Sequence, residues 1–144
     1  MPQTIAACLL LLVASTLLHY EALGYLNSRL PGWRIPRRFK VVVVILGAFC
    51  THAIEMALYG GTLYALVTWL GAGQLSGSSG TSWLSCLYFS AETYTSLGFG
   101  DLTPIGPVRL LAGTEALNGL LLVAWSASFT YLSMERFWQP APRA

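Results

Sequence analysis

The sequence predicts an all-α membrane protein with three transmembrane helices and one shorter segment that enters and leaves the membrane on the same side. Only 10% of the 144 residues are charged and 55% are hydrophobic, whereas a soluble domain of this size carries about 25% charged residues. The apolar residues gather in three long runs, and about 20 residues suffice to cross a bilayer as a helix. The net charge of +2 is too small to favour a nucleic-acid partner.

Residues 1–28 are expected to form the first transmembrane helix. No basic segment precedes its apolar run and no clear small-residue cleavage site follows, so a retained helix is favoured over a signal peptide. His19 is then expected near the far end of this helix, at the membrane interface. Cys8, Cys50 and Cys86 lie in apolar runs without metal-ligand spacing and are expected to stay reduced.

Residues 29–40 are expected to form a basic loop in which prolines prevent a helix and Arg37, Arg38 and Lys40 contact lipid phosphates. In this scheme only Arg109 lies on the opposite side of the membrane. The basic residues on the side of the loop are Arg29, Arg34, Arg37, Arg38, Lys40, Arg136 and Arg143. Positive residues favour the cytoplasm, which predicts an outer N-terminus and a cytoplasmic tail over residues 135–144.

Residues 41–134 form the second predicted unit, with long helices over 41–70 and 107–134. Gly60 and Gly61 are expected to loosen the first of these helices. A polar Gly/Ser stretch over 71–81 is expected to be a flexible connector. The helix expected over 82–94 rises only about 20 Å, too little to span a bilayer, so it is expected to be re-entrant. Irregular backbone at membrane depth needs a surrounding protein wall, which favours an oligomer.

Glycines at alternate positions mark the segment 95–101. Gly98 and Gly100 allow a positive φ at every second residue. Such a strand can turn consecutive carbonyls toward one axis, where a ring of oxygens can replace the hydration shell of a monovalent cation. The short helix before it points its C-terminal end, worth about half a negative charge, toward the same region.

Residues 88–104 resemble the pore loop of potassium channels, whose filter motif reads TVGYG. Here the filter reads Ser96-Leu97-Gly98-Phe99-Gly100 and is followed by Asp101. The order of outer helix, pore helix, filter and inner helix resembles small bacterial two-helix channels with an added N-terminal helix. The resemblance implies a homotetramer in the cell (inner) membrane that conducts K+ and needs no cofactor.

The resemblance also implies roles for individual residues. The backbone carbonyls of Ser96, Leu97, Gly98 and Phe99 would hold K+, with the Ser96 hydroxyl at the innermost site. Serine, leucine and phenylalanine replace the usual threonine, valine and tyrosine, so a weakly selective monovalent cation channel remains an alternative. A non-conducting accessory membrane protein is another. No Gly-x-Ser-x-Gly nucleophile elbow occurs, and an enzyme is not predicted.

Side chains around the filter are expected to support it. Glu92 and Asp101 match a carboxylate pair of some relatives, in which one group would be protonated. Tyr88 would donate to Asp101, and Thr95 is also assigned to filter support. This cluster is expected to act either as a static brace or as a control of filter inactivation.

Polar residues in the long helices complete the candidates. Glu115, Gly119, Ser126 and Thr130 share a stripe of the last helix that fits either a pore lining, with Gly119 as a hinge, or close helix packing. Glu115 fits a functional group or a protonated, hydrogen-bonded side chain.

On the second long helix, His52 and Glu55 share one face. As a metal site this pair has too few ligands. An interhelical hydrogen bond is favoured for it, and a pH sensor is an alternative.

Overall fold

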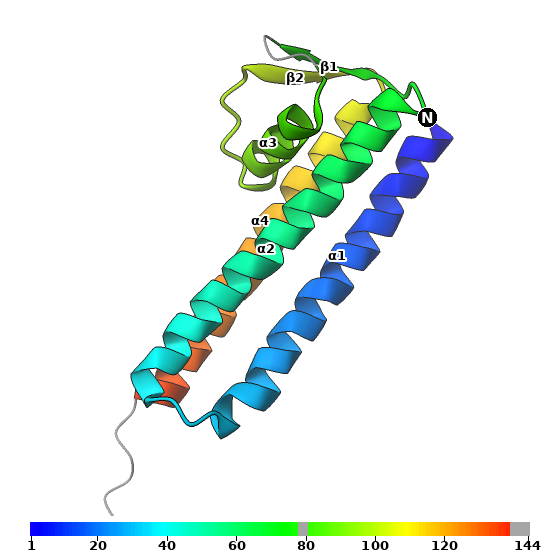
Figure 1. Ribbon diagram of the computed structural model, residues 1–144. Coiled ribbons are helices and arrows are strands. Elements are labelled where there is room, and N and C mark those ends of the chain that lie inside the picture. Colours follow the sequence, from blue (N-terminus) through cyan, green and yellow to red (C-terminus); the bar gives the residue numbers. More distant parts are fainter. Residues whose placement is uncertain (78–80, 139–144) are drawn as a thin grey trace, which may run out of the picture.

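A computed structural model describes residues 1–77 and 81–138 and confirms the predicted all-α architecture (Figure 1). The elements in chain order are α1 (Pro2–Arg29), a 3-10 turn (Leu30–Gly32), α2 (Arg37–Thr68), β1 (Gln74–Gly77), α3 (Trp83–Tyr94), β2 (Leu102–Ile105) and α4 (Val108–Trp138). Three of these helices, α1, α2 and α4, are long and apolar enough to cross a membrane. Their length and composition are those of a membrane protein.

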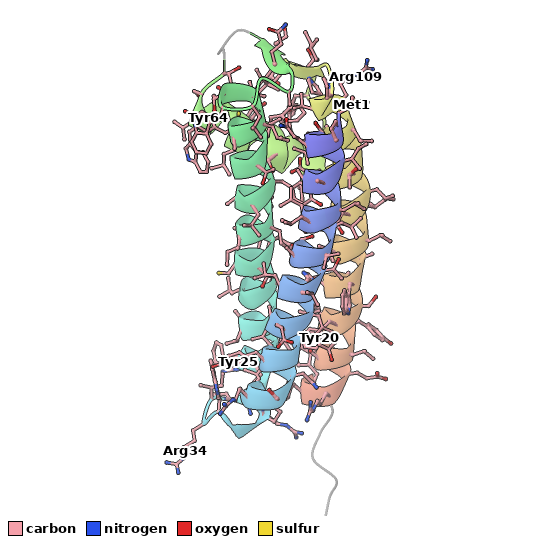
Figure 2. The ribbon with its side chains drawn as sticks, turned by 90° about the vertical axis from the view of Figure 1, so that its right-hand side faces the viewer. Met1, Tyr20, Tyr25, Arg34, Tyr64 and Arg109 are labelled. Carbon is pink, nitrogen blue, oxygen red and sulfur yellow. The ribbon has the colours of Figure 1, made fainter. Side chains whose placement is uncertain are left out.

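Helix α1 packs along α2 and α4 of its own chain, on the side away from α3 (Figures 1 and 2). It continues to Arg29, so His19 lies well inside the helix rather than at its end. His19 is fully buried against α2 and α4. The expectation that His19 lies at the membrane interface was therefore wrong.

The basic segment after α1 is shorter than expected, because α2 begins at Arg37 directly after Pro36. Lys40 is buried, and its Nζ donates a hydrogen bond to the carbonyl of Pro31 at 2.8 Å. Lys40 thus closes the turn instead of reaching lipid. Figure 2 shows Arg34 at this end of the molecule and Arg109 at the other, beside Met1. Arg143 lies outside the described residues.

The glycine pair in α2 does not interrupt the helix, which runs without a break from Arg37 to Thr68. A Cβ at Gly60 would lie 3.0 Å from the Cα of Leu87 and 3.1 Å from the carbonyl oxygen of Cys86. The missing side chain therefore lets the backbone of α3 approach α2. Gly60 serves packing rather than the bending that the sequence suggested.

The Gly/Ser connector differs from the prediction, since Gln74–Gly77 form strand β1. It pairs antiparallel with β2, with Leu75 opposite Pro104 and Gly77 opposite Leu102. A Cβ at Gly77 would lie 2.4 Å from the carbonyl oxygen of Asp101, so only glycine fits there. This two-stranded sheet ties the segment before α3 to the segment after the filter. Residues 78–80 lie outside the described part.

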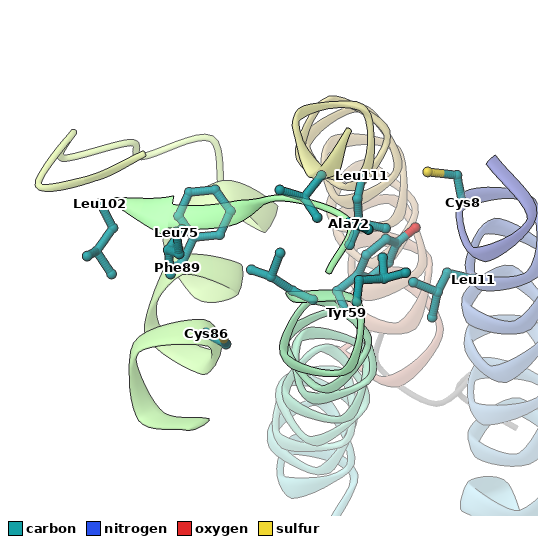
Figure 3. Packing of buried hydrophobic residues seen from close by; sticks show 12 residues of the cluster. Cys8, Leu11, Tyr59, Ala72, Leu75, Cys86, Phe89, Leu102 and Leu111 are labelled. Carbon is teal, nitrogen blue, oxygen red and sulfur yellow. The ribbon is translucent and has the colours of Figure 1, made fainter. Parts of the chain in front are cut away.

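The main apolar core lies at the end of the molecule that carries α3 (Figure 3). Residues from every helix and both strands meet there, including Leu11, Tyr59, Phe89, Leu102 and Leu111. A smaller cluster at the opposite end joins Leu30, Val41, Val44 and Phe137. Helix α4 extends to Trp138, so the first residues of the predicted tail are helical, and residues 139–144 are not described.

Candidate functional site

The short helix α3 is fixed at both ends by its own side chains. The Ser82 hydroxyl, at the N-cap, accepts a hydrogen bond from the backbone N–H of Ser85 at 3.0 Å. At the other end, Thr95 Oγ1 donates to the carbonyl of Ala91 at 2.8 Å. Tyr94, the last residue of the helix, is fully buried. The helix end is therefore a firm starting point for the segment 95–101.

The backbone of the predicted filter alternates between two conformations. Ser96, Gly98 and Gly100 have φ values of 58°, 55° and 81°. The expected alternation at Gly98 and Gly100 thus extends to Ser96, the one non-glycine residue with a positive φ among the described residues. A serine in this region is strained, and such strain persists only where the surroundings enforce it.

Hydrogen bonds to α3 enforce this conformation. The N–H groups of Leu97 and Gly98 both donate to the carbonyl of Glu92, at 2.8 and 3.3 Å, and the Ser96 N–H donates to the carbonyl of Thr93 at 3.0 Å. Within the described residues, the carbonyls of Ser96, Leu97, Gly98 and Phe99 accept no hydrogen bond. Four consecutive oxygens are therefore free to bind a ligand.

Glu92 holds the filter from behind. Its side chain is buried, and Oε2 accepts a hydrogen bond from the Phe99 N–H at 3.1 Å. The expected partner Asp101 is exposed, and Tyr88 OH lies 3.4 Å from its Oδ1. Desolvation, followed by the charges of Asp101 and Glu92, raises the pKa of Tyr88. The two carboxylates thus contact different partners rather than each other.

The filter segment is open on its other side. All residues from Thr95 to Asp101 are exposed, and the exposed fractions of Leu97 and Phe99 reach 60% and 67%. A run of free carbonyls at membrane depth requires a wall of protein or water. One chain does not provide that wall, so the site is incomplete in a single subunit.

The polar stripe of α4 points inward in this chain. Gly119 lies against Tyr94, because a Cβ there would be 2.2 Å from the Tyr94 carbonyl oxygen. Glu115 is buried and hydrogen-bonds to Ser90, and Ser126 hydrogen-bonds to His19. These contacts match the packing alternative, and the pore-lining alternative stays a prediction for Ser126 and Thr130.

Thr130 is only partly buried and borders a cavity of about 370 Å³ that Tyr94 and Thr95 also line. Ser126, a second residue of the predicted stripe, lines the same cavity. This cavity connects the lower end of the filter with the space between α2 and α4.

The contacts of Ser90 bear on the chemical state of Glu115. Ser90 Oγ lies 2.7 Å from the Met56 carbonyl oxygen and is also bonded to the Glu115 carboxyl. A hydroxyl has one hydrogen to donate. Both contacts are satisfied together only when Ser90 donates to Met56 and a protonated Glu115 donates to Ser90.

A second buried polar cluster joins α1, α2, α3 and α4. Glu55 contacts His52 at 3.1 Å within α2, contacts His19 of α1 at 3.0 Å and accepts from Tyr94 OH of α3. The contacts to His19 and Tyr94 are interhelical, which is the kind of hydrogen bond that the sequence favoured. Sequence reasoning missed His19 and Tyr94. The available signal was that polar groups inside membrane helices usually face one another.

Comparison with known proteins gives the family. A family model described as "Ion channel" matches residues 41–135, about two-thirds of the chain. The inward rectifier potassium channel Kirbac3.1 of Paramagnetospirillum magnetotacticum is 29% identical over 106 residues. That match covers 73% of this chain but 36% of the relative. No solved structure matches. The chain, with its pore helix, alternating filter backbone and flanking membrane helices, belongs to the pore-loop ion-channel family that includes potassium channels.

Proposed function

We propose that four copies of this chain form a potassium-selective channel, with the carbonyls of Ser96, Leu97, Gly98 and Phe99 as the ion ligands. The observation that carries the proposal is the alternation of positive φ at Ser96, Gly98 and Gly100 together with four unengaged carbonyls. K+ filters use such carbonyl rings to replace the ion's hydration shell. The named relative, a potassium channel, adds support.

The homotetramer rests on the incomplete site. The filter residues are exposed in one chain, and symmetric copies around an axis would enclose them. Helix α1 lies on the side of α2 and α4 away from α3, so it leaves the filter face free for neighbouring copies (Figure 1). We therefore place α1 at the periphery of the assembly.

The orientation in the cell (inner) membrane follows from charge. The described basic residues other than Arg109 lie at the end that carries the turn between α1 and α2 and the end of α4, which we place in the cytoplasm. The N-terminus, the sheet and the filter entrance then face outward. Trp33 and Trp138, both exposed near the cytoplasmic end, suit the aromatic belt at the lipid headgroups.

A weakly selective monovalent cation channel is the second candidate. The back of this filter is held at Phe99 through its N–H and Glu92, not through a side-chain hydroxyl. With fewer side-chain anchors, the filter carbonyls can move inward more easily around an ion smaller than K+, such as Na+. This alternative keeps the pore and changes only its selectivity between K+ and Na+.

The test is cation flux into liposomes that contain the purified protein, driven first by a K+ gradient and then by a Na+ gradient. Gly98→Asp is the control for a disabled filter. A Cβ at Gly98 would meet nothing within 4 Å in one chain, but any side chain at its φ of 55° is strained. In the assembled filter the four added carboxylates would stand among the free carbonyls and disrupt their ring.

Flux with K+ that is absent with Na+ and lost in Gly98→Asp is the expected result. Equal flux with both ions would replace the proposal with the weakly selective channel. A folded tetramer that conducts neither ion, even under varied pH and voltage, would favour the non-conducting accessory protein.

A further inference from the structure

We propose that His19, His52 and Glu55 form a binding site for a divalent transition-metal ion of the Zn²⁺ class, buried between α1 and α2. The proposal rests on side chains remote from the filter carbonyls and does not depend on ion conduction. The pair of residues visible in the sequence had too few ligands for a metal. The structure supplies the third ligand, from a different helix.

Each histidine nitrogen lies close to a carboxylate oxygen of Glu55, near the spacing that a metal requires. Nδ1 of His19 lies 3.0 Å from Glu55 Oε1, and Nδ1 of His52 lies 3.1 Å from Glu55 Oε2. All three groups offer a ligand atom within 4.8 Å of one another. Bonds of about 2.0–2.1 Å from Zn²⁺ to nitrogen or oxygen place neighbouring tetrahedral ligands about 3.3 Å apart. Small side-chain rotations would therefore bring the three ligands around one ion.

Neighbouring groups complete the site as metal sites usually require. Tyr94 OH lies 2.9 Å from His52 Nδ1 and also bonds to Glu55, so its oxygen stands near a fourth coordination position. On the outer side, Ser126 Oγ lies 3.2 Å from His19 Nε2. A histidine that binds metal through one ring nitrogen usually hydrogen-bonds through the other, which fixes its tautomer and orientation.

Burial and ligand type favour a transition metal over Mg²⁺ or Ca²⁺. His19 and Glu55 are fully buried, and the side chain of His52 is 12% exposed. Imidazole nitrogen suits Zn²⁺, Cu²⁺ and Ni²⁺, whereas Mg²⁺ and Ca²⁺ prefer sets of oxygen ligands. The cavity of about 370 Å³ that His52 and Tyr94 border gives an ion a route to the ligands.

The test measures Zn²⁺ affinity of the full chain, purified in detergent and stripped with a chelator, by competition with a Zn²⁺-binding dye. We expect one Zn²⁺ per chain and no competition by excess Mg²⁺. His19→Gln, His52→Gln and Glu55→Gln should each weaken binding by more than about 100-fold, the upper end of what loss of an outer hydrogen bond costs. Ser126→Ala should weaken it by about 10–100-fold.

Two matched controls exclude other ligands. Cys50 is an exposed thiol on α2, so Cys50→Ser tests whether a surface cysteine binds the ion. Glu21 is an exposed carboxylate two residues beyond His19, and Glu21→Gln removes a charge near the cluster without touching it. Both variants should keep the affinity of the unaltered protein. A loss of affinity in either, with no loss in the Gln variants of the cluster, would overturn the proposal.

Zinc X-ray absorption of the unaltered, loaded protein decides the case even where a variant fails to fold. The expected signature is two imidazoles and an oxygen at about 2.0–2.2 Å. Sulfur at about 2.3 Å, or no imidazole, would overturn the site. Absence of stoichiometric Zn²⁺ binding would also overturn it, in favour of a purely hydrogen-bonded cluster, and would leave the proposed conduction pathway unaffected.

Discussion

Two polar regions of the chain differ in how complete they are within one subunit. In the filter segment, residues 95–101, every residue is exposed and four carbonyls accept no hydrogen bond among the described residues. In the buried cluster around Glu55, each polar side chain already has partners from other helices. The first region needs other copies to enclose it, and the second is assembled within one chain.

Tyr94 connects the two regions. Its hydroxyl belongs to the buried cluster, its backbone ends α3, and Thr95 begins the filter segment directly after it. The complete region therefore positions the incomplete one. Changes that move Tyr94 should damage both the subunit and conduction, whereas changes confined to the filter should damage conduction alone.

The largest effect is expected at the contact between α4 and Tyr94. Gly119→Ala would place a methyl group 2.2 Å from the Tyr94 carbonyl oxygen, so helix and filter base must separate. We expect a loss of about 3 kcal/mol in unfolding free energy and little remaining K+ flux. Thermal unfolding in detergent and liposome flux measure the two effects.

Gly113→Ala is the matched control on the same helix. A Cβ at Gly113 meets nothing within 4 Å, and alanine is the better helix former by about 0.5–1 kcal/mol. This variant should be at least as stable as the unaltered protein. Equal stability of the two alanine variants would show that α4 does not press on Tyr94.

The next effect is expected in the filter alone. Glu92→Ala leaves the Phe99 N–H without its acceptor, at a cost of about 1–3 kcal/mol where no water replaces it. We expect currents in planar bilayers to decay faster, and any loss in the thermal stability of the assembly to stay within this cost. Glu92→Gln keeps an oxygen acceptor, so its currents should decay at a rate between that of the unaltered channel and that of Glu92→Ala. Steady currents from Glu92→Ala, like those of the unaltered channel, would leave Glu92 as a brace without control of inactivation.

A smaller effect, on the free energy of unfolding, is expected where the buried carboxyl of Glu115 bonds to the hydroxyl of Ser90. Ser90→Ala removes the partner of Glu115 and of the Met56 carbonyl, and we expect a loss of about 1–2 kcal/mol in unfolding free energy. Ser128→Ala is its control, because that hydroxyl is exposed and bonds only within α4. Thermal unfolding should show no change beyond about 0.5 kcal/mol for Ser128→Ala. Similar losses in both variants would mean that Glu115 finds another partner.

The sequence was sufficient for the three long helices and for the positive φ of the two filter glycines, for physical reasons. Apolar runs long enough for a bilayer predict helices by length alone, and α1, α2 and α4 follow them closely. Gly98 and Gly100 predict positive φ because no side chain opposes it. The same argument does not predict the positive φ of Ser96, because that φ depends on hydrogen bonds that only the folded α3 provides.

Sequence patterns were weaker on which surfaces meet. The stripe of α4 was identified correctly as one face, but periodicity does not say whether that face meets a pore or a neighbouring helix, and Gly119 meets Tyr94. Helix α1 is apolar on most sides, so its pattern does not reveal that His19 turns toward Glu55. Strand β1 is short and polar, and its pairing with β2 depends on contacts distant in the chain.

The smallest effect is expected at Tyr88, and it sharpens the comparison between one subunit and the assembly. The hydroxyl of Tyr88 lies 3.4 Å from Asp101 Oδ1, beyond the roughly 2.5–3.0 Å of a good O–H···O bond. Tyr88→Phe should therefore change filter stability by less than about 0.5 kcal/mol, and current decay should match that of the unaltered channel. Decay as fast as in Glu92→Ala would show that Tyr88 and Asp101 draw together when four chains assemble. The outer part of the filter would then be built by the tetramer, while its base, at Tyr94, is built by the single chain.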